Sequence, residues 1–420
     1  MRTDNVDVCV VGGGPGGMMA GLLLARQGVR VAVLEKHADF LRDFRGDTVH
    51  PSTLEAMEEL GIVAEFLKIP HVKAPAITME TAAGPLLFAD FSGLPSRYPF
   101  MAFMPQWEVL NFLAETGRGY PGFVLLQGTK VTGLLTTGDR VVGVRAVNDA
   151  GPLEIRTNLV IAADGRQSEL RAKAGMSVAK NEAPMDALWF KLSRLEGERL
   201  PTVRLGNGFL IGCINRGDYW QIAHMIPKGG YPAIQAGGLK QFRLAISRIH
   251  ECFTERLATE IRGWHDVHLL EVRVDRLRRW YRPGLLFIGD AAHAMSPAGG
   301  VGINLAVQDA IAAARLLGPV LSAGRSPSVS ELRRVQRRRK PIARLVQLVQ
   351  LHLLADLYPR AGRPGTDRPR MVRLSRRFRP LPRILARLFG LGIRPERVPP
   401  AAAREQSPMN RLTWRRSAAR

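Results

Sequence analysis

A glycine-rich run at residues 289–304, GDAAHAMSPAGGVGIN, combines the residue types that suit a polar, ring-bearing ligand. It follows the apolar segment Leu285–Ile288 and leads into a helical pattern from about Asn304 to Leu316. The acid near its start can bind a chain of sugar-like hydroxyls, while backbone N–H groups at the positive end of the helix can face an electron-rich ring. The predicted binding residues of this run are Gly289, Asp290, Gly300, Gly302, Ile303 and Asn304.

A second glycine-rich bend lies between an apolar strand pattern at residues 6–11 and a helical pattern at residues 18–27. A further strand, 29–34, ends at Glu35, about twenty residues on, where a carboxylate can accept a hydrogen bond from a ribose hydroxyl. In the G-x-G-x-x-G pattern, the glycines permit a tight turn, a close approach to a pyrophosphate and close helix–strand packing. The three glycines are Gly12, Gly14 and Gly17. The two bends together predict a flavin adenine dinucleotide.

The composition is typical of an enzyme with two or three domains. The chain has 420 residues, and its three cysteines, Cys9, Cys213 and Cys252, show no metal-ligand spacing. We therefore expect no metal and a reducing compartment, with Cys9 in the core of the first strand. No signal peptide and no run of ~20 apolar residues is visible, which predicts a cytoplasmic protein.

The positive charge is concentrated at the C-terminal end. Residues 331–420 contain 24 Lys and Arg against 5 Asp and Glu, which is +19 of the total charge of +23. This basic region can be a solvated surface, or it can contact the inner face of an anionic membrane. Within it, residues 380–390 alternate arginines with bulky apolar groups, so their apolar face can enter a bilayer or dock on the body. Nucleic acid is not the expected partner.

Other patterns place the remaining elements. We expect strands around a turn at Gly84–Pro85, a helix from Gln106 to Glu115, and a buried strand that ends at Asp164–Gly165. Residues 189–226 are β-rich, a helical stretch lies near 239–262, and a helix that packs on the body spans 341–357. The S-T-L-E sequence at residues 52–55 predicts a capping box that opens a helix.

Three fingerprints stand in order along the chain: Gly12–Gly17, then Asp164–Gly165, then Gly289–Asp290. This triplet resembles the para-hydroxybenzoate-hydroxylase-like flavoprotein monooxygenases over roughly residues 5–320. The resemblance implies an α/β fold in which a Rossmann-like FAD-binding domain is interleaved with a β-sheet substrate domain, followed by a helical basic C-terminal region. The implied boundaries are 1–75, 100–180 and 270–330 for the FAD-binding domain, 76–99 and 181–269 for the substrate domain, and 331–420 for the C-terminal region.

The resemblance also implies roles for individual residues, with FAD as cofactor and NAD(P)H as co-substrate. Glu35 is expected to bind the adenosine ribose and Asp290 the ribitol chain, and Asp164 is linked to both FAD and NAD(P)H. Arg45 and Gln106 match flavin-contacting residues, and Pro297 stands where the family aims a backbone carbonyl at the substrate. His293 and His50 are expected to be structural.

The implied reaction is hydroxylation of an aromatic, phenolic or quinone-like, lipophilic small molecule in secondary metabolism. In this family the reduced flavin reacts with O₂ to give a C4a-hydroperoxide, so the protein must mainly position and shield the cofactor. Tyr219 and Trp220, in the β-rich segment, either contact the substrate or pack in the core. Residues 220–227 lack the W-x-W-x-I-P pattern of flavin halogenases. A flavoprotein that acts without oxygen insertion and a flavoprotein that acts mainly through its basic tail are the alternatives.

Overall fold

The computed structural model describes residues 2–41, 48–82, 84–181, 183–206, 209–357 and 370–402. Its largest sheet contains five parallel strands in the order β20-β11-β1-β2-β8. Antiparallel β19 flanks β20, and antiparallel β10 and β9 continue from β11. The bounds are β1 (Arg2–Val11), β2 (Val31–Leu34), β8 (Phe123–Leu126), β9 (Lys130–Thr137), β10 (Arg140–Asn148), β11 (Gly151–Ala162), β19 (Tyr281–Arg282) and β20 (Leu285–Phe287).

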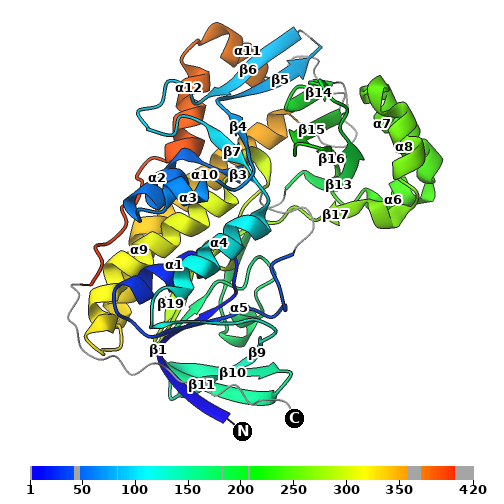
Figure 1. Ribbon diagram of the computed structural model, residues 1–420. Helices are drawn as coiled ribbons and strands as arrows, with labels where there is room; N and C mark the ends of the chain where they lie inside the picture. The colour runs from blue at the N-terminus through cyan, green and yellow to red at the C-terminus, as the bar shows by residue number, and fades with distance from the viewer. Residues whose placement is uncertain are drawn as a thin grey trace.

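Three helices cover one face of this sheet, and α1 packs between the other two (Figure 1). They are α1 (Pro15–Arg26), α4 (Gln106–Arg118) and α9 (Gly302–Ser322). Helix α1 approaches α9 closely because Gly16 has no side chain: a Cβ there would lie 3.2 Å from the Ala306 side chain. The region 298–322 is long and apolar enough to span a membrane, but 78% of its most apolar 18-residue window is buried in the protein, as expected of a core helix.

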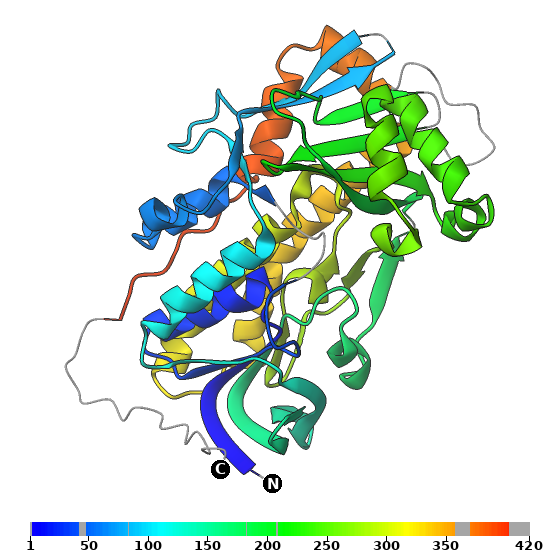
Figure 2. The same ribbon diagram turned by 45° about the vertical axis from the view of Figure 1, so that its right-hand side comes forward.

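A second sheet of seven strands runs β17-β13-β16-β15-β14-β5-β6. Helices α6–α8 cover one of its faces (Figure 2), where Phe190, Trp220 and Ile222 join a buried cluster with Phe242 and Phe253. The bounds are β5 (Ala76–Thr81), β6 (Gly84–Asp90), β13 (Met185–Ser193), β14 (Val203–Gly206), β15 (Phe209–Asn215), β16 (Tyr219–Pro227), β17 (His268–Leu270), α6 (Tyr231–Ala236), α7 (Leu239–Ile249), η1 (Glu251–Phe253), α8 (Thr254–Glu260) and η2 (Trp264–Asp266). Of the two alternatives given for Trp220, substrate contact and core packing, the structure shows core packing.

Two small sheets and several short helices connect the large sheets. One small sheet contains β3 (Thr48–Val49), β7 (Met101–Phe103) and β4 (Val72–Ala74), and the other contains β12 (Val178–Asn181), β18 (Val274–Leu277) and β21 (His293–Ala294). The short helices are α2 (Pro51–Glu59), α3 (Val63–Phe66), α5 (Glu169–Lys173), η3 (Gly289–Ala291) and η4 (Ala298–Gly300).

The predicted capping box at residues 52–55 is wrong. Helix α2 begins one residue earlier, at Pro51, and its N-cap makes no side-chain hydrogen bond. The hydroxyls of Ser52 and Thr53 donate instead to Asn304 Oδ1, at 2.6 and 2.8 Å. A buried tertiary acceptor has replaced the local cap.

The described parts of the basic C-terminal region are mainly helical and dock on the body. It contains α10 (Val329–Leu357), α11 (Arg370–Arg377), α12 (Leu381–Ala386) and the π-helix η5 (Arg387–Leu391), and α10 starts twelve residues before the predicted helix. The apolar side of residues 380–390 is inside the protein: Leu385 and Phe389 pack with Val301 and Leu305 in one buried cluster. The sequence left two alternatives for this apolar face, insertion into a bilayer or docking on the body, and in the structure Leu385 and Phe389 dock on the body.

Candidate functional site

The predicted ligand-binding motifs meet at one edge of the large sheet. Strands β20, β11, β1 and β2 are parallel neighbours, so their carboxyl ends lie together. Residues that follow these ends come from widely separated parts of the sequence: Gly12, Glu35, Asp164 and Gly289 with Asp290. The carboxyl edge of parallel strands is where open α/β sheets bind nucleotides.

The first bend has the close packing that its glycines predict. Gly12 has a φ of +107°, and a Cβ there would lie 2.3 Å from Ala163 O, while a Cβ at Gly17 would lie 1.9 Å from Gly12 O. In contrast, a Cβ at Gly14 would meet nothing within 4 Å, so its backbone borders open space. Glu35 lies beside the bend, where its Oε2 accepts a hydrogen bond from Gly13 N at 2.9 Å.

Two buried polar atoms near the second and third motifs are available for contacts to a ligand. Asp164 accepts a hydrogen bond from Leu170 N at 3.3 Å, but its Oδ1 has no partner among the described residues. Burial raises the pKa of Asp164, against the lowering effect of hydrogen bonds from Ser168 and Leu170. Arg166 Nη2 lies 3.3 Å from Asp290 Oδ2. Arg166 Nη1 is buried and has no hydrogen-bond partner among the residues that the structure describes. Buried polar groups normally have partners, so these atoms fit contacts to a bound cofactor.

Arg171, which the sequence analysis did not single out, holds the turn that carries Asp290. Its guanidinium donates to the carbonyls of Ala291 at 2.7 Å and Asp290 at 2.6 Å, and forms an ion pair with Asp275 at 2.9 Å. The side chain is buried. A planar guanidinium with several fixed donors can orient two carbonyls and a carboxylate at once.

The next turn, at residues 298–300, has a backbone that only glycine adopts easily. Gly299 and Gly300 have φ values of +77° and +63°. The Gly300 carbonyl accepts hydrogen bonds from Thr48 Oγ1 at 2.8 Å and from His50 Nε2 at 3.2 Å. Burial lowers the pKa of His50 to about 4, so the ring is neutral near pH 7 and its Nε2 carries the donated proton. Pro297, at the start of this turn, accepts a hydrogen bond from Gly300 N at 3.0 Å.

Two glutamines of α10 donate hydrogen bonds to the loop at residues 294–298. Gln347 Nε2 donates to the carbonyls of Asp275 and Ala294, at 2.8 and 2.9 Å. Gln350 Nε2 donates to the carbonyls of Ser296 and Ala298, at 3.0 and 2.6 Å. Both glutamines are buried. The sequence analysis missed them because they lie 53 and 54 residues from Ala294 and Ser296.

A buried charge cluster anchors the helix that follows. Asp309 Oδ2 accepts from His293 Nε2 at 2.6 Å and from Gly289 N at 3.0 Å, and Asp309 Oδ1 accepts from Arg339 Nε at 2.8 Å. Burial would raise the pKa of Asp309, but His293 and Arg339 hold it below its usual value. His293 is thus a buried partner of Asp309.

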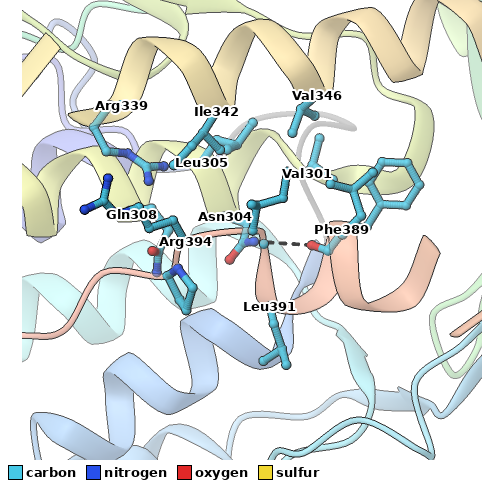
Figure 3. Close-up of a pocket in the computed structure, with 14 residues that line it drawn as sticks. Val301, Asn304, Leu305, Gln308, Arg339, Ile342, Val346, Phe389, Leu391 and Arg394 are labelled. Carbon is cyan, nitrogen blue, oxygen red and sulfur yellow. Dashed lines mark hydrogen bonds between the residues drawn. The ribbon is translucent and has the colours of Figure 1, made fainter. Parts of the chain in front are cut away.

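The N-terminus of α9 faces the same edge of the sheet. Its first intrahelical hydrogen bond runs from Leu305 N to Val301 O, so the preceding amides, including those of Gly302, Ile303 and Asn304, have no intrahelical partner. The Asn304 side chain is buried, and its Nδ2 donates to Phe389 O at 3.4 Å (Figure 3). This contact joins the start of α9 to the C-terminal π-helix.

The cavity of Figure 3 is too small to hold an aromatic substrate. It lies between α9, α10 and the C-terminal segment, and its volume is about 20 Å³, room for roughly one water molecule. Gln308 Nε2 lines this cavity and has no hydrogen-bond partner among the described residues, so a water molecule would satisfy it.

The second face of the seven-stranded sheet is turned toward the glycine-rich loop. Leu210 and Met225, paired on β15 and β16, belong to a cluster that includes Leu354 of α10 and Ala298 of the loop. Because side chains alternate along a strand, Trp189, Tyr219 and Gln221 lie on this face, while Trp220 lies on the opposite one. Tyr219 is half-buried, with Lys191 Nζ 5.3 Å from its ring centroid.

The two remaining predicted residues are Gln106 and Arg45. Gln106 is the first residue of α4 and is half-buried. Arg45 lies outside the described residues. No group of three or more His, Cys, Asp or Glu side chains that could hold a metal ion occurs within the described ranges.

The fold and this edge define an FAD-binding α/β flavoprotein, and comparison with known proteins is consistent with that class. A family model described as an FAD binding domain matches residues 5–349. The chain is 34% identical over 351 residues to the 6-methylpretetramide 4-monooxygenase of Streptomyces rimosus, which covers 83% of each chain. It is 27% identical over 383 residues to the pentachlorophenol 4-monooxygenase of Sphingobium chlorophenolicum, covering 86% of this chain and 66% of that one.

Solved structures agree on the fold. The anhydrotetracycline hydroxylase OxyS of Streptomyces rimosus superposes with a TM-score of 0.73 at 23% identity, covering 93% of this chain and 77% of that one. The Pseudomonas aeruginosa protein PqsL, in complex with 2-aminobenzoylacetate, superposes with a TM-score of 0.72 at 22% identity, covering 85% and 97%.

The chain belongs to the FAD-binding family of class A flavin-dependent monooxygenases, which use NAD(P)H. It is an FAD-dependent aromatic hydroxylase. The predicted family, fold class and cofactors are confirmed.

Proposed function

We propose that this enzyme inserts one atom of O₂ into a lipophilic aromatic, phenolic or quinone-like molecule of secondary metabolism. The observation that carries the proposal is the character of the sheet face opposite residues 298–300. Its inner positions are apolar or uncharged along β15 and the middle of β16, and the charged side chain of Lys191 lies at an exposed position. Such a wall favours an apolar ring system over a small, carboxylate-bearing substrate.

The relatives support a polycyclic or phenolic substrate. The names of the Streptomyces rimosus and Sphingobium chlorophenolicum relatives specify 6-methylpretetramide and pentachlorophenol as their substrates. Both names describe ring compounds, which fits the uncharged wall of this chain.

We infer that the motif residues hold FAD as the sequence predicts. Asp290 binds the ribitol chain, Glu35 binds the adenosine ribose, and the open backbone at Gly14 borders the pyrophosphate. The unpartnered atoms of Asp164 and Arg166 complete the site, and Asp164 also serves the NAD(P)H step. When bound, FAD supplies the activation of O₂.

The protein's own contribution is to position and to exclude water. The amides at the start of α9 can stabilise negative charge on a ring placed before them. Gln347 and Gln350 hold the loop that connects Asp290 to these amides. Pro297 lies in this loop, at the position where the family resemblance places a backbone carbonyl toward the substrate. In this proposal the chain divides at the predicted boundaries, with β5, β6 and β13–β17 forming the substrate domain. Tyr219 lies on the inner face of that domain, where it can contact the substrate.

Oxygen incorporation tests the proposed reaction. Aromatic candidates are screened for stimulated NAD(P)H oxidation under air, and the product from an active one is made under ¹⁸O₂. One labelled oxygen atom per product is expected. Product without label, or product formed equally well without O₂, supports the alternative of a flavoprotein oxidoreductase that acts without oxygen insertion.

We also propose peripheral membrane contact through the outer side of the C-terminal helices. Exposed Leu374, Phe378 and Ile384 alternate there with exposed arginines such as Arg377 and Arg383. Each basic residue near an anionic surface contributes about 1 kcal/mol. Sedimentation with vesicles rich in phosphatidylglycerol is expected for the parent chain and reduced for a full-length variant in which the exposed apolar residues are replaced (Leu374→Ser, Phe378→Ser, Ile384→Ser). Equal sedimentation of the two, or none by either at low salt, would leave the arginines as ordinary surface.

A further inference from the structure

The substrate-side face of the seven-stranded sheet contains two buried hydrogen-bond donors without acceptors. Gln221 Nε2 on β16 and Trp189 Nε1 on β13 are both buried and have no partner among the described residues. Leaving such a group unpaired costs ~1–3 kcal/mol, so an acceptor is expected beside each of them in the working enzyme.

The orientation of the Gln221 amide is determined by its neighbour. Arg216 Nε donates to Gln221 Oε1 at 2.8 Å. A guanidinium can only donate, so the oxygen of the amide must face Arg216 and the NH₂ group must face the other way. The side chain is only 2% exposed, which means that the NH₂ group points into the protein rather than to solvent.

The two donors are close to each other. Trp189 pairs with Ala223 and Lys191 pairs with Gln221 in the antiparallel ladder between β13 and β16. Trp189 and Gln221 are therefore diagonal neighbours on one face, a distance that long side chains span.

Side chains of this face form clusters that reach toward the glycine-rich loop. Met225, further along β16, belongs to a cluster with Ala298. Ile214, which pairs with Gln221, packs against the cluster that contains Phe91, and the Phe91 ring lies 6.4 Å from the His50 ring. His50 in turn contacts Gly300 O. Both series of contacts, one through Met225 and one through Ile214 and Phe91, connect the strands that carry the donors to the loop at residues 298–300.

We propose that Gln221 and Trp189 are specificity-determining residues that donate hydrogen bonds to oxygen atoms on the aromatic substrate. The substrate class that fits is a ring system with at least one carbonyl, phenol or phenolate oxygen, held by these two neutral donors on a sheet face whose other inward side chains are mainly apolar, with the Arg216 guanidinium behind Gln221. This inference deepens the proposed function and rests on it for the location of the substrate. It adds that the wall recognises oxygen, and not only the shape of the rings.

Binding of two matched probes to the oxidised FAD enzyme tests this proposal without turnover. The probes are 1-naphthol and 1-methylnaphthalene, which are similar in shape but differ in a hydroxyl and a methyl group. Their dissociation constants come from the perturbation of the visible flavin absorption. The parent enzyme is expected to bind 1-naphthol about tenfold more tightly than 1-methylnaphthalene.

The variants are chosen to remove one donor each while keeping shape. Gln221→Glu keeps the acceptor for Arg216 and replaces the NH₂ group by an oxygen, and Trp189→Phe removes the indole N–H. Each is expected to weaken 1-naphthol binding about tenfold and to leave 1-methylnaphthalene binding within twofold, with unchanged FAD content. Gln241→Glu is the matched control: it makes the same substitution at an exposed position on α7 and is expected to preserve the preference.

Several results would overturn the assignment. A parent enzyme that binds the two probes equally, or binds neither, contradicts recognition of oxygen by this wall. So do donor variants that keep the parent's preference or lose both probes to the same extent. The ¹⁸O₂ experiment judges the reaction separately: labelled product with no probe preference removes only this inference, and a preference without label removes only the monooxygenase reaction.

Discussion

Replacing Glu396 by alanine should destabilise the protein far more than the loss of an ordinary acid from a basic region. The Glu396 carboxylate is completely buried and accepts hydrogen bonds from Arg338 Nε at 2.6 Å and Arg315 Nη2 at 2.7 Å. Arg339 Nη1 lies 3.7 Å away, and the backbone N–H of Glu396 donates to Gln308 Oε1. This residue therefore attaches the C-terminal segment to α9 and α10.

The size of the effect depends on what the arginines can do afterwards. Breaking a buried ion pair on one side typically costs ~3–5 kcal/mol. Arg315 and Arg338 have side-chain exposures of 36% and 20% and can turn toward water, whereas Arg339 is 2% exposed and keeps only Asp309. We therefore expect a loss near the lower limit, about 3 kcal/mol. Glu396→Gln, which keeps the shape, should lose less.

Thermal unfolding, followed by tryptophan and FAD fluorescence, measures the difference. A loss of 3 kcal/mol corresponds to a midpoint lower by about 3–4 °C in a protein of this size. The matched control is Glu65→Ala, which breaks a pair with Lys68 whose side chains are 65% and 71% exposed and should change stability by less than ~0.5 kcal/mol. If Glu396→Ala and Glu65→Ala unfold at the same temperature, the buried cluster does not stabilise the docked segment and the reasoning is wrong.

Three further predictions concern the cofactor edge. Asp290→Ala should weaken FAD binding by ~1–3 kcal/mol through the loss of a ribitol contact, and FAD retention under dialysis at the parent's level would contradict the placement of this residue. Gly300→Ala puts a Cβ 2.2 Å from a threonine hydroxyl at a φ of +63°, so it should lower the unfolding midpoint and shift the flavin spectrum, and an unchanged spectrum with parental stability would refute the strain argument. Burial lowers the pKa of His50 from 6.5 to about 4, so as the pH falls this residue is protonated in the unfolded chain before it is protonated in the folded protein. The contribution of neutral His50 to the free energy of unfolding is fully present above pH 6.5 and is lost as the pH falls toward 4. The free energy of unfolding of His50→Gln should therefore depend less on pH between 6.5 and 4, which denaturant titrations at several pH values can measure.

Much of the cofactor edge could be predicted from the sequence because its determinants are local. Gly12 needs a positive φ and has a carbonyl 2.3 Å from where a Cβ would be, so the chain must place glycine there. Glu35, Asp164 and Asp290 follow buried strands, and parallel strands bring such positions to one edge whatever the intervening sequence. Strand, bend and acid are all visible in short windows.

The supporting residues could not be predicted in the same way, because their partners are distant in the sequence. Arg171 binds the carbonyl of Asp290 at a separation of 119 residues, and Gln350 binds that of Ser296 at 54. Each occupies an unremarkable position in a helix pattern, and only the tertiary fold gives it an acceptor. The capping-box prediction failed for the same reason, since Ser52 met Asn304, 252 residues away.

The basic C-terminal region shows why a charge count by itself misjudges a segment. By composition the body is nearly neutral and the region from residue 331 is strongly basic, which suggests an appendage that faces a polyanion. In the fold, acids of the body meet this region individually: Asp309 pairs with Arg339, Glu59 with Arg397, and Asp90 lies 3.6 Å from Arg383.

Two of these acids belong to the elements that position the cofactor edge or the C-terminal segment beside it. Asp309 is on the helix whose N-terminus faces the flavin site, and it also binds the backbone of Gly289. Glu59 closes α2 and accepts from Val398 N at 2.7 Å. Arg339 of α10 therefore links the glycine-rich motif and the C-terminal segment: it pairs with Asp309, which also accepts from Gly289 N, and it lies 3.7 Å from Glu396 of the docked C-terminal segment. Loss of Arg339 or Glu396 should therefore alter the position of the Gly289 backbone, although neither side chain lies in the glycine-rich loop. For this reason residues 370–402 are part of the folded enzyme and are not a separable tail.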